Sequence, residues 1–488
     1  MPKSIRPHTL LFAVFPVLFL YSQNMAEVDA LAMARPLLIV LASAVLLTLV
    51  LDRVFALGLK AGLIVSLLLV MFFSYGHFYD WLLQSFSVRH RFLLPIWIAC
   101  WVPLLVMLVR TRRTLQGIDR VATVIAGTAV ATSVLTIGGF LLNMTSRRVV
   151  PPLAPANITA RVHGARLPDI YYIVLDAYAG GPVLRDLYDY DNGAFLNGLE
   201  RRGFRLASHS RSNYSMTLPS TAATLNMDYL ENLTRLTGTP SNNTRPLCAL
   251  IDSCRVQRIL AANGYRIIRI DPPPAMFYRD FPGMLLRTTM LAYLDYTNSA
   301  ARTLNVLHRL FAARPTAGPT FVYAHVMCPH RPYVFGPHGE IKSLAERMQV
   351  RSDSARTRRA YLDQVEFVNS KVDSLVDQIL ARRDRRTIII LQGDHGPRNY
   401  APMDHPTPVS LREGSAILNA YYLPGGAHAL YETISPVNSF RLVFRDYFGL
   451  DYPPLADRSF HNWSKHPYQW LALGDADAAK DTMIAGAR

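Results

Sequence analysis

Apolar residues are concentrated between the N-terminus of the chain and Leu142. They form five runs, which cover Leu10–Tyr21, Pro36–Leu51, Leu57–Phe73, Phe92–Val109 and Val121–Leu142. A helix needs about 20 apolar residues to cross a bilayer, and flanking aromatic and charged residues can extend shorter runs into the interface. So many consecutive apolar runs are hard to cover with a water-soluble surface. We therefore expect an N-terminal bundle of about five transmembrane helices over residues 1–144.

The first run has an alternative interpretation as a cleaved signal peptide, because Lys3 and Arg6 precede it and Ala26 could end a weak cleavage site. Either interpretation leaves the C-terminal part of the chain on the same side of the membrane. Basic residues gather in alternate short loops, at Lys3, Arg6, Arg53, Lys60, Arg110, Arg112, Arg113 and Arg120. Such loops are usually cytoplasmic, so the residues after Leu142 are predicted to face outward.

The pattern changes after a proline-rich stretch at 145–168, which is predicted to be a linker. Four short apolar runs predict buried strands, at Asp169–Leu175, Tyr265–Ile270, Thr320–His325 and Thr387–Leu391. Helices are predicted between these strands, at Gly193–Gly203, Val256–Asn263 and Arg356–Arg383. Buried strands separated by helices predict an α/β domain with a mostly parallel central sheet over 169–470, followed by a tail at 471–488.

Charge and cysteine content narrow the function further. Lys and Arg number 51 against 35 Asp and Glu, which gives a formal net charge of +16. An excess of positive charge is typical of proteins that bind nucleic acid, anionic lipid or anionic substrates. An exported domain, however, rarely meets nucleic acid. The four cysteines exclude a cysteine-rich zinc module. Cys248 and Cys254 would lie in the exported part, so a disulfide between them is left open.

Candidate ligands follow three of the predicted strands. Asp176 comes directly after the first, His325 ends the third, and Asp394 and His395 follow the fourth. Carboxyl ends of parallel strands meet at one edge of the sheet, where ligands bind. Oxygen and imidazole donors suit a hard or borderline divalent cation, although a lone Asp after a strand is more often a turn or cap residue. Glycines on both sides of Asp394-His395 would let the backbone approach a ligand closely.

A hydroxyl-rich stretch, Ser212–Thr221, leads into a predicted helix and supplies a candidate nucleophile. A helix N-terminus there would offer N–H groups to an anion, and the Thr217 hydroxyl could ionise beside a metal. An N-cap and turn is the alternative. Arg398 is a candidate for bidentate phosphate binding and His405 for substrate contact, with solvated surface positions as the alternatives.

These motifs together resemble the alkaline-phosphatase/sulfatase superfamily, in particular membrane-anchored sulfatase-like transferases of the lipoteichoic-acid-synthase and phosphoethanolamine-transferase type. The segments that carry the resemblance are DIYYIVLDAYA, NYSMTLPS, HVMCPHRPY and IIILQGDHG. The resemblance implies an alkaline-phosphatase-like fold and one divalent ion (Mn, Mg, Zn or Ca). It implies a metal site made of Asp176, Thr217, Asp394 and His395. It also implies that Thr217 is the nucleophile and that His330, with His325, binds substrate oxygens or assists the leaving group.

Two departures from the sulfatase pattern bear on the reaction. Thr217 stands where sulfatases have the Cys or Ser that becomes formylglycine, and Thr221 stands where they have Arg. Asp176 stands where lipoteichoic-acid synthases typically have Glu. No second full set of Asp and His ligands is found, which makes a two-metal phosphatase less favoured. The departures at Thr217 and Thr221 favour a phosphoryl-type transferase over a true sulfatase.

The function implied by the resemblance is transfer of a phospho-substituent, of phosphoglycerol or phosphoethanolamine type, through a phospho-threonine. The donor would be a membrane lipid and the acceptor a cell-envelope glycan or polysaccharide, with no nucleic acid involved. The location implied is the bacterial inner membrane, with a periplasmic catalytic domain. A hydrolase of phosphate or sulfate esters is the chemical alternative. An inactive scaffold subunit of an envelope-polymer assembly is the alternative from another class.

Overall fold

The structure is a computed structural model that describes residues 4–25, 28, 30–85, 90–146, 167–270, 281–291, 295–314, 318–343, 346–347, 350, 354–382, 386–425, 429–463 and 466–474. The chain forms two compact units. One comprises Met1–Val149 with Met276–Asn298, and the other comprises Val150–Ala275 with Ser299–Arg488. Most of the predicted linker, and the tail after residue 474, lie outside the described residues.

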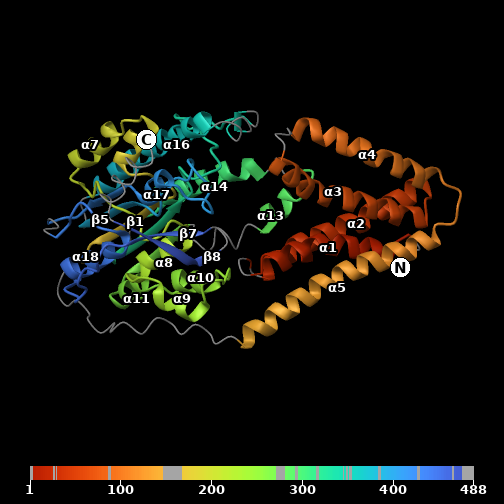
Figure 1. The fold of residues 1–488 in the computed structure, drawn as a ribbon, viewed down its shortest axis with the longest axis horizontal. Helices are drawn as coiled ribbons and strands as arrows, with labels where there is room; N and C mark the ends of the chain where they lie inside the picture. The colour runs from red at the N-terminus through yellow and green to blue at the C-terminus, as the bar shows by residue number, and fades with distance from the viewer. Residues whose placement is uncertain are drawn as a thin grey trace. The chain divides into compact units, whose positions relative to one another are not determined.

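The first unit is a bundle of apolar helices (Figure 1). Its N-terminal elements are α1 (Pro7–Gln23), η1 (Ala30–Met33), α2 (Ala34–Phe55), α3 (Leu59–Ser85), α4 (His90–Arg110) and α5 (Gln116–Ser146). Four segments are long and apolar enough to cross a membrane, and they are Ala30–Phe55, Leu59–Leu82, Phe92–Arg110 and Gln116–Leu142. Helix α1 is shorter, at 17 residues. The predicted membrane-helix bundle is confirmed, and the count of about five spans corresponds to these four helices plus α1.

A later segment of the chain completes this bundle, and the sequence pattern did not predict it. Helix α13 (Phe281–Arg287) belongs to the membrane unit. Phe281 is fully buried in an apolar cluster with residues of α1 and α3. The Gly76 N–H of α3 donates to the Thr288 carbonyl at 2.9 Å, and the Met290 N–H donates to the Phe72 carbonyl at 3.1 Å. Docking is so close that a Cβ on Gly76 would lie 2.1 Å from the Arg287 carbonyl oxygen.

The second unit contains a six-stranded sheet in the order β2-β6-β5-β1-β4-β3. The strands are β1 (Asp169–Leu175), β2 (Arg205–Leu206), β3 (Arg266–Ile270), β4 (Thr320–Val326), β5 (Thr387–Gly393) and β6 (Asn419–Tyr422). Strands β5, β1, β4 and β3 are parallel, β6 is antiparallel to β5, and β2 is antiparallel to β6. The predicted mostly parallel sheet is therefore confirmed, with its four apolar strands at the centre and on one edge.

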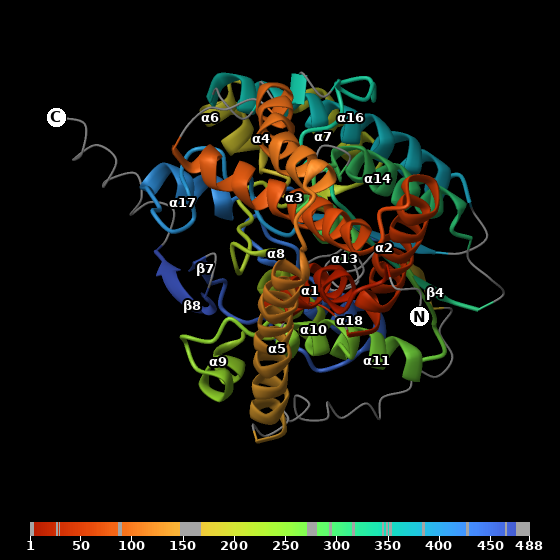
Figure 2. The ribbon, with the colours of Figure 1, turned by 90° about the vertical axis from the view of Figure 1, so that its right-hand side faces the viewer.

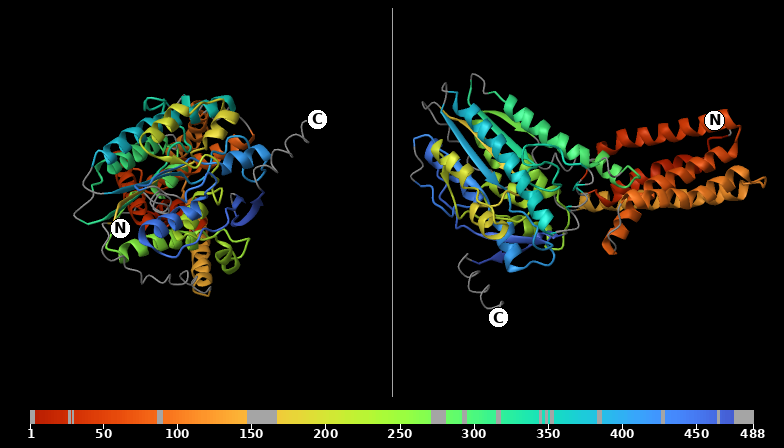
Figure 3. Two further views of the ribbon diagram at one scale, coloured as in Figure 1. Left: turned by 90° about the vertical axis from the view of Figure 1, so that its left-hand side faces the viewer. Right: turned by 90° about the horizontal axis from the view of Figure 1, so that it is seen from above.

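Helices cover both faces of the sheet (Figures 2 and 3). One face packs against α6 (Gly181–Tyr188), α7 (Gly193–Arg201), α14 (Asp295–Ala312) and α16 (Ser354–Leu380). The other face packs against α8 (Thr217–Asn226), α10 (Arg245–Asp252), α11 (Arg255–Ala262) and α18 (Pro436–Phe448). Alternate residues of β1 enter the two cores, with Ile173 in one and Val174 in the other, because side chains along a strand point to opposite faces. This is why the strand is apolar without interruption.

Some of the described elements are neither strands of this sheet nor among the helices named above. They are α9 (Glu231–Thr237), α17 (Pro408–Ser415) and a two-stranded antiparallel hairpin of β7 (Ser459–Trp463) and β8 (His466–Leu473). The hairpin was not predicted from the sequence. Cys248 and Cys254 are both buried free thiols, so the disulfide that the sequence left open is not formed.

Candidate metal and nucleophile site

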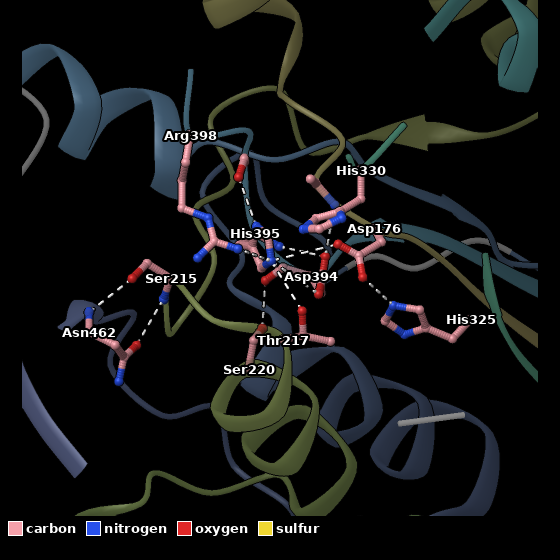
Figure 4. A network of polar contacts seen from close by, with 12 residues as sticks. Asp176, Ser215, Thr217, Ser220, His325, His330, Asp394, His395, Arg398 and Asn462 are labelled. Carbon is pink, nitrogen blue, oxygen red and sulfur yellow. Dashed lines mark hydrogen bonds and ion pairs between the residues drawn. The ribbon is translucent and has the colours of Figure 1, made fainter. Parts of the chain in front are cut away.

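The strand order brings the predicted ligands to one edge of the sheet. Strand β1 pairs with β4 on one side and with β5 on the other, and Leu175 lies level with both Val326 and Gly393. Asp176 and Asp394 are the next residues along β1 and β5, so their side chains project from neighbouring strand ends (Figure 4). The sequence argument from strand ends therefore placed these two carboxylates correctly beside each other.

Each carboxylate has one oxygen held by the protein and one oxygen without a partner. Asp394 Oδ1 accepts the N–H groups of Ala177 at 3.1 Å and of His395 at 2.9 Å. Asp176 Oδ2 pairs with His325 Nε2 at 2.9 Å. Asp176 Oδ1 and Asp394 Oδ2 are buried and have no hydrogen-bond partner among the described residues. A buried carboxylate oxygen without a partner is costly, so these two atoms are suited to bind a cation.

His395 presents a lone pair to the same place. Its Nδ1 bonds to the Gly396 carbonyl at 2.8 Å, and because a carbonyl only accepts, Nδ1 carries the proton. The unprotonated Nε2 lies 3.2 Å from Thr217 Oγ1, 3.7 Å from Asp176 Oδ1 and 3.6 Å from Asp394 Oδ2. Two orphaned carboxylate oxygens, an imidazole nitrogen and a hydroxyl thus lie near one another. This donor set fits a divalent cation.

His325 and Thr217 lie on different sides of Asp176 (Figure 4). Asp176, His325 and Asp394 each offer a ligand atom, and these atoms all lie within 4.8 Å of one another. However, the short contact of His325 Nε2 to Asp176 Oδ2 is that of a hydrogen-bond donor to a carboxylate, and His325 is fully buried. This geometry is typical of a residue that orients a metal-binding carboxylate, whereas the sequence had suggested substrate contact.

Burial and neighbouring charge set the protonation states in the absence of a cation. Burial, with the negative charge of Asp176 added, raises the pKa of Asp394 to about 6. Burial also acts to raise the pKa of Asp176, but the imidazoles of His330, His325 and His395 outweigh it and hold that pKa well below its usual range. Burial, with the charge of Arg398, lowers the pKa of His395 to about 3. The imidazole of His395 is therefore neutral at pH 7, and its Nε2 lone pair, which accepts an N–H of Arg398, is the one that would bind a cation.

Thr217 is the first residue of α8, and it is 9% exposed. Met216, in an extended conformation, is the N-cap, so the Thr217 side chain lies at the N-terminus of the helix. Ser220, one turn further, donates its hydroxyl to the Asp394 carbonyl at 2.6 Å. That bond joins the helix to the end of β5. The sequence argument noted Ser220 only as part of a hydroxyl-rich stretch and missed this role.

Arg398 reaches into the site from the loop after β5. Its guanidinium lies 3.1 Å from His395 Nε2 and also contacts the Met403 sulfur. No carboxylate of the described residues forms an ion pair with it at 4.0 Å or less. Burial lowers the pKa of Arg398, although the charges of Asp176 and Asp394 act in the opposite direction. A cation that is buried without an ion pair beside a nucleophile can receive an anion.

The two remaining predicted residues are placed differently. His330 is half-buried, with its ring centroid 6.1 Å from that of His395. His405 is exposed in the loop between β5 and α17, and no hydrogen bond or ion pair connects its ring to the site within the described part of the chain. The site thus brings together Asp176, Thr217, His330, Asp394, His395 and Arg398, with His325 behind Asp176.

Gly393 and Gly396, on either side of Asp394-His395, are needed for a reason other than the close approach to a ligand that the sequence suggested. A Cβ on Gly396 would lie 1.9 Å from the Glu413 carbonyl oxygen, and a Cβ on Gly393 would lie 2.5 Å from the Tyr178 carbonyl oxygen. Both glycines therefore permit close approach of protein backbone to protein backbone, rather than to a ligand. They hold Asp394-His395 against neighbouring loops.

Residues 169–435, more than half of the chain, match the model of the Sulfatase family. The chain belongs to the Sulfatase family. The matched region contains all the strands of the central sheet and every site residue described above. It ends before α18 and the β7–β8 hairpin. No curated protein matches the chain.

Solved structures to which the chain is similar include transferases and sulfatases. The periplasmic domain of EptC from Escherichia coli is 14% identical, with a TM-score of 0.43 over 67% of this chain and 97% of that one. The lipooligosaccharide phosphoethanolamine transferase A (EptA) from Neisseria meningitidis, an integral membrane protein, is 12% identical, with a TM-score of 0.39 over 90% and 95%. A 2-O GAG sulfatase is 16% identical, with a TM-score of 0.41 over 59% and 72%. Similarity this low assigns no reaction to the chain.

Proposed function

We propose that this protein is a membrane-anchored, metal-dependent enzyme that transfers a phospho-substituent through a covalent intermediate on Thr217. One observation carries the proposal: the Thr217 hydroxyl lies beside Nε2 of His395 and near two carboxylate oxygens that have no hydrogen-bond partner among the described residues. Asp176, Asp394, His395 and Thr217 would hold the divalent cation. When bound, such a cation supplies positive charge that lowers the pKa of a hydroxyl and stabilises charge on a phosphoryl group.

The side chains have distinct roles in the proposed reaction. Thr217 Oγ forms a bond to phosphorus as the bond from phosphorus to the leaving oxygen breaks, and the Thr217 proton passes through solvent to His330, which burial keeps neutral beforehand by lowering its pKa. Arg398 receives the anionic oxygens of the phosphoryl group, since no carboxylate in the described part of the chain forms an ion pair with its guanidinium. His330 donates a proton to the leaving oxygen and then accepts the proton of the incoming hydroxyl. Attack by that hydroxyl breaks the bond to Thr217 and frees the enzyme.

The membrane unit supports a lipid as the donor. Four helices with the length and composition of membrane spans would keep the catalytic unit at a bilayer surface and raise the effective concentration of a lipid head group. In the proposed topology the catalytic unit is extracytoplasmic, in the periplasm of a bacterial inner membrane, and the acceptor is an envelope glycan. An inactive scaffold would have no need for two carboxylates with unsatisfied oxygens, a neutral imidazole and a threonine in one place.

The proposal is tested with the purified full-length protein in detergent, given phosphatidylethanolamine or phosphatidylglycerol together with each candidate divalent metal. Intact-protein mass spectrometry is expected to show a phospho-substituent on the wild type, located to Thr217 by peptide mapping. Thr217→Ala should lose the adduct and the turnover. Thr237→Ala is the matched control, because the Thr237 hydroxyl lies on α9 and donates to the Leu233 carbonyl. Turnover retained by Thr217→Ala contradicts the proposal.

Hydrolysis is the second candidate, because the nucleophile and the cation site would serve water as readily as a sugar. The same incubation separates the two acceptors. Release of the soluble phospho-head group without a glycan identifies a hydrolase, and release only with an envelope glycan identifies a transferase. A sulfate ester given in parallel should leave no adduct on Thr217, since formylglycine cannot form there.

A further inference from the structure

The β7–β8 hairpin lies beyond the region that matches the family, yet it pairs with the segment that leads to the nucleophile. The Phe460 N–H donates to the Asn213 carbonyl at 2.9 Å, and the Ser215 N–H donates to the Phe460 carbonyl at 3.1 Å. Tyr214 and Phe460 form a parallel bridge between these segments. The two residues before Met216 and Thr217 are therefore held by the hairpin as a short added strand.

A reciprocal pair of hydrogen bonds strengthens this pairing at Ser215 (Figure 4). The Ser215 N–H donates to Asn462 Oδ1 at 3.1 Å, and the Asn462 N–H donates to Ser215 Oγ at 2.9 Å. Asn462 is fully buried, and its Nδ2 donates to the Pro467 carbonyl at 3.1 Å, across the hairpin. Each polar group of the Asn462 side chain thus has a backbone partner, which fixes Ser215 two residues before Thr217.

His461 connects the same hairpin to the loop that carries Arg398. Its Nε2 lies 2.9 Å from the Met403 carbonyl, and because a carbonyl only accepts, Nε2 carries the proton. Its Nδ1 is then an acceptor, at 3.5 Å from Ser215 Oγ. The Met403 sulfur contacts the Arg398 guanidinium. A buried imidazole thus joins the nucleophile segment on one side to the Arg398 loop on the other.

We infer that Asn462 and His461 are positioning residues, which set the Thr217 hydroxyl and the Arg398 guanidinium at a fixed separation. The inference rests on the proposed function, because it concerns the same site. Neither side chain touches a reacting atom. Their effect is exerted through Ser215 and Met403, and a nucleophile displaced by about 1 Å can lose about 100-fold in rate. Loss of the hydrogen bonds made by Asn462 or His461 should therefore lower kcat more than it changes substrate binding.

Asn462→Ala is the first test, with Asn438→Ala as the matched control. Asn438 is also buried, on α18, and clamps a backbone segment in the same way: its Nδ2 donates to the Leu455 carbonyl and its Oδ1 accepts the Leu455 N–H, both at 2.8 Å. With the holoenzyme and a soluble probe, bis(p-nitrophenyl) phosphate, Asn462→Ala is expected to lower kcat about tenfold to 100-fold with KM within about twofold. Asn438→Ala should change neither value per folded molecule.

A double-mutant cycle gives a second readout. Ser215→Ala removes the hydroxyl that joins Asn462 to His461, so Ser215→Ala and Asn462→Ala should be strongly non-additive in kcat. Additive losses, or a kcat of Asn462→Ala equal to that of the wild type, overturn the inference and leave the proposed function intact. If Thr217→Ala turns the probe over as the wild type does, the proposed function and the inference both fail. Melting temperatures of all variants correct the rates for the folded fraction.

Discussion

Thr217 Oγ1 and His395 Nε2 lie 3.2 Å apart although 178 residues separate them in the chain. The hydroxyl comes from the first turn of α8 and the imidazole from the end of β5. Ser220 joins the same two elements through its bond to the Asp394 carbonyl. The nucleophile and the cation ligands are therefore held in one rigid piece of the fold, and substitutions within it should have separable effects.

Loss of either carboxylate should remove the cation. Asp176→Asn and Asp394→Asn each delete a negative charge from the donor set, and we expect metal content after dialysis to fall below about a tenth of the wild-type value. Elemental analysis of the purified proteins measures this directly. Asp373→Asn is the control, since that carboxylate pairs with Arg202 at 2.8 Å on another helix. Full metal content in both site variants would refute the assignment.

The stability of the metal-free protein should depend on pH through Asp394. Its pKa in the fold is about 6, against about 4 for an unfolded chain. The protonated carboxyl favours the fold, so this contribution is fully present below about pH 4 and is lost as the pH rises to about 6. The upper limit is about 3 kcal/mol in the free energy of unfolding.

Asp394→Asn isolates this contribution, because it cannot titrate. Chelator-treated wild type and variant would be unfolded at several pH values between 4 and 7. The stability of the wild type relative to the variant should fall as the pH rises through that window. A difference that is constant with pH, or that grows, would contradict the raised pKa.

Arg398→Met should weaken the reaction of an anionic substrate. The substitution keeps a long apolar side chain and removes the charge that would receive phosphoryl oxygens. Hydrogen bonds to charged groups contribute about 1.5–3 kcal/mol, which corresponds to a loss of roughly 10-fold to 150-fold in kcat/KM. Arg412→Met serves as the control, because Arg412 pairs with Asp186 on a partly exposed surface. A value for Arg398→Met equal to that of the control would exclude the anion-binding role.

Gly76→Ala should destabilise the membrane unit. Its new methyl group would lie 2.1 Å from the Arg287 carbonyl oxygen, so α3 and the segment after α13 must separate. Overpacking of this kind costs about 1–3 kcal/mol. Gly127→Ala, in α5, adds the same methyl group where nothing lies within 4 Å, and alanine is the better helix former there. Thermal unfolding in detergent should show a lower melting temperature for Gly76→Ala alone; equal values would show that the docking is loose.

The central sheet was predictable because its strands are buried on both faces. Asp169–Leu175 is apolar at every position after its first, so no choice of face was needed. The ends of such strands then located Asp176, Asp394 and His395. The same rule could not tell the role of His325, which lies within β4 level with Val174 and reaches the outer side of the Asp176 carboxylate. Which side of a ligand a residue occupies is set by packing, and the strand pattern does not contain it.

Contacts between distant segments account for what the sequence did not predict. Phe281 and Leu285 fill a core made by α1 and α3, but their own segment has no unusual pattern. In the sequence, nothing distinguishes Gly76 from other glycines of the membrane helices; its role follows only from the contact with Thr288. Asn462 and Ser215 each look like a polar residue of a turn or strand. Their importance follows from a pairing across 247 residues, which no local pattern reports.

The return of residues 276–298 to the membrane unit means that the anchor is not a continuous stretch of sequence. During synthesis, the ribosome must make nearly 300 residues before all segments of the bundle are present. A soluble fragment cut at the end of the linker would carry Phe281 and Leu285 away from the helices that bury them. Such a fragment would expose an apolar segment in the middle of its chain, and its solubility would depend on substituting polar residues in that segment.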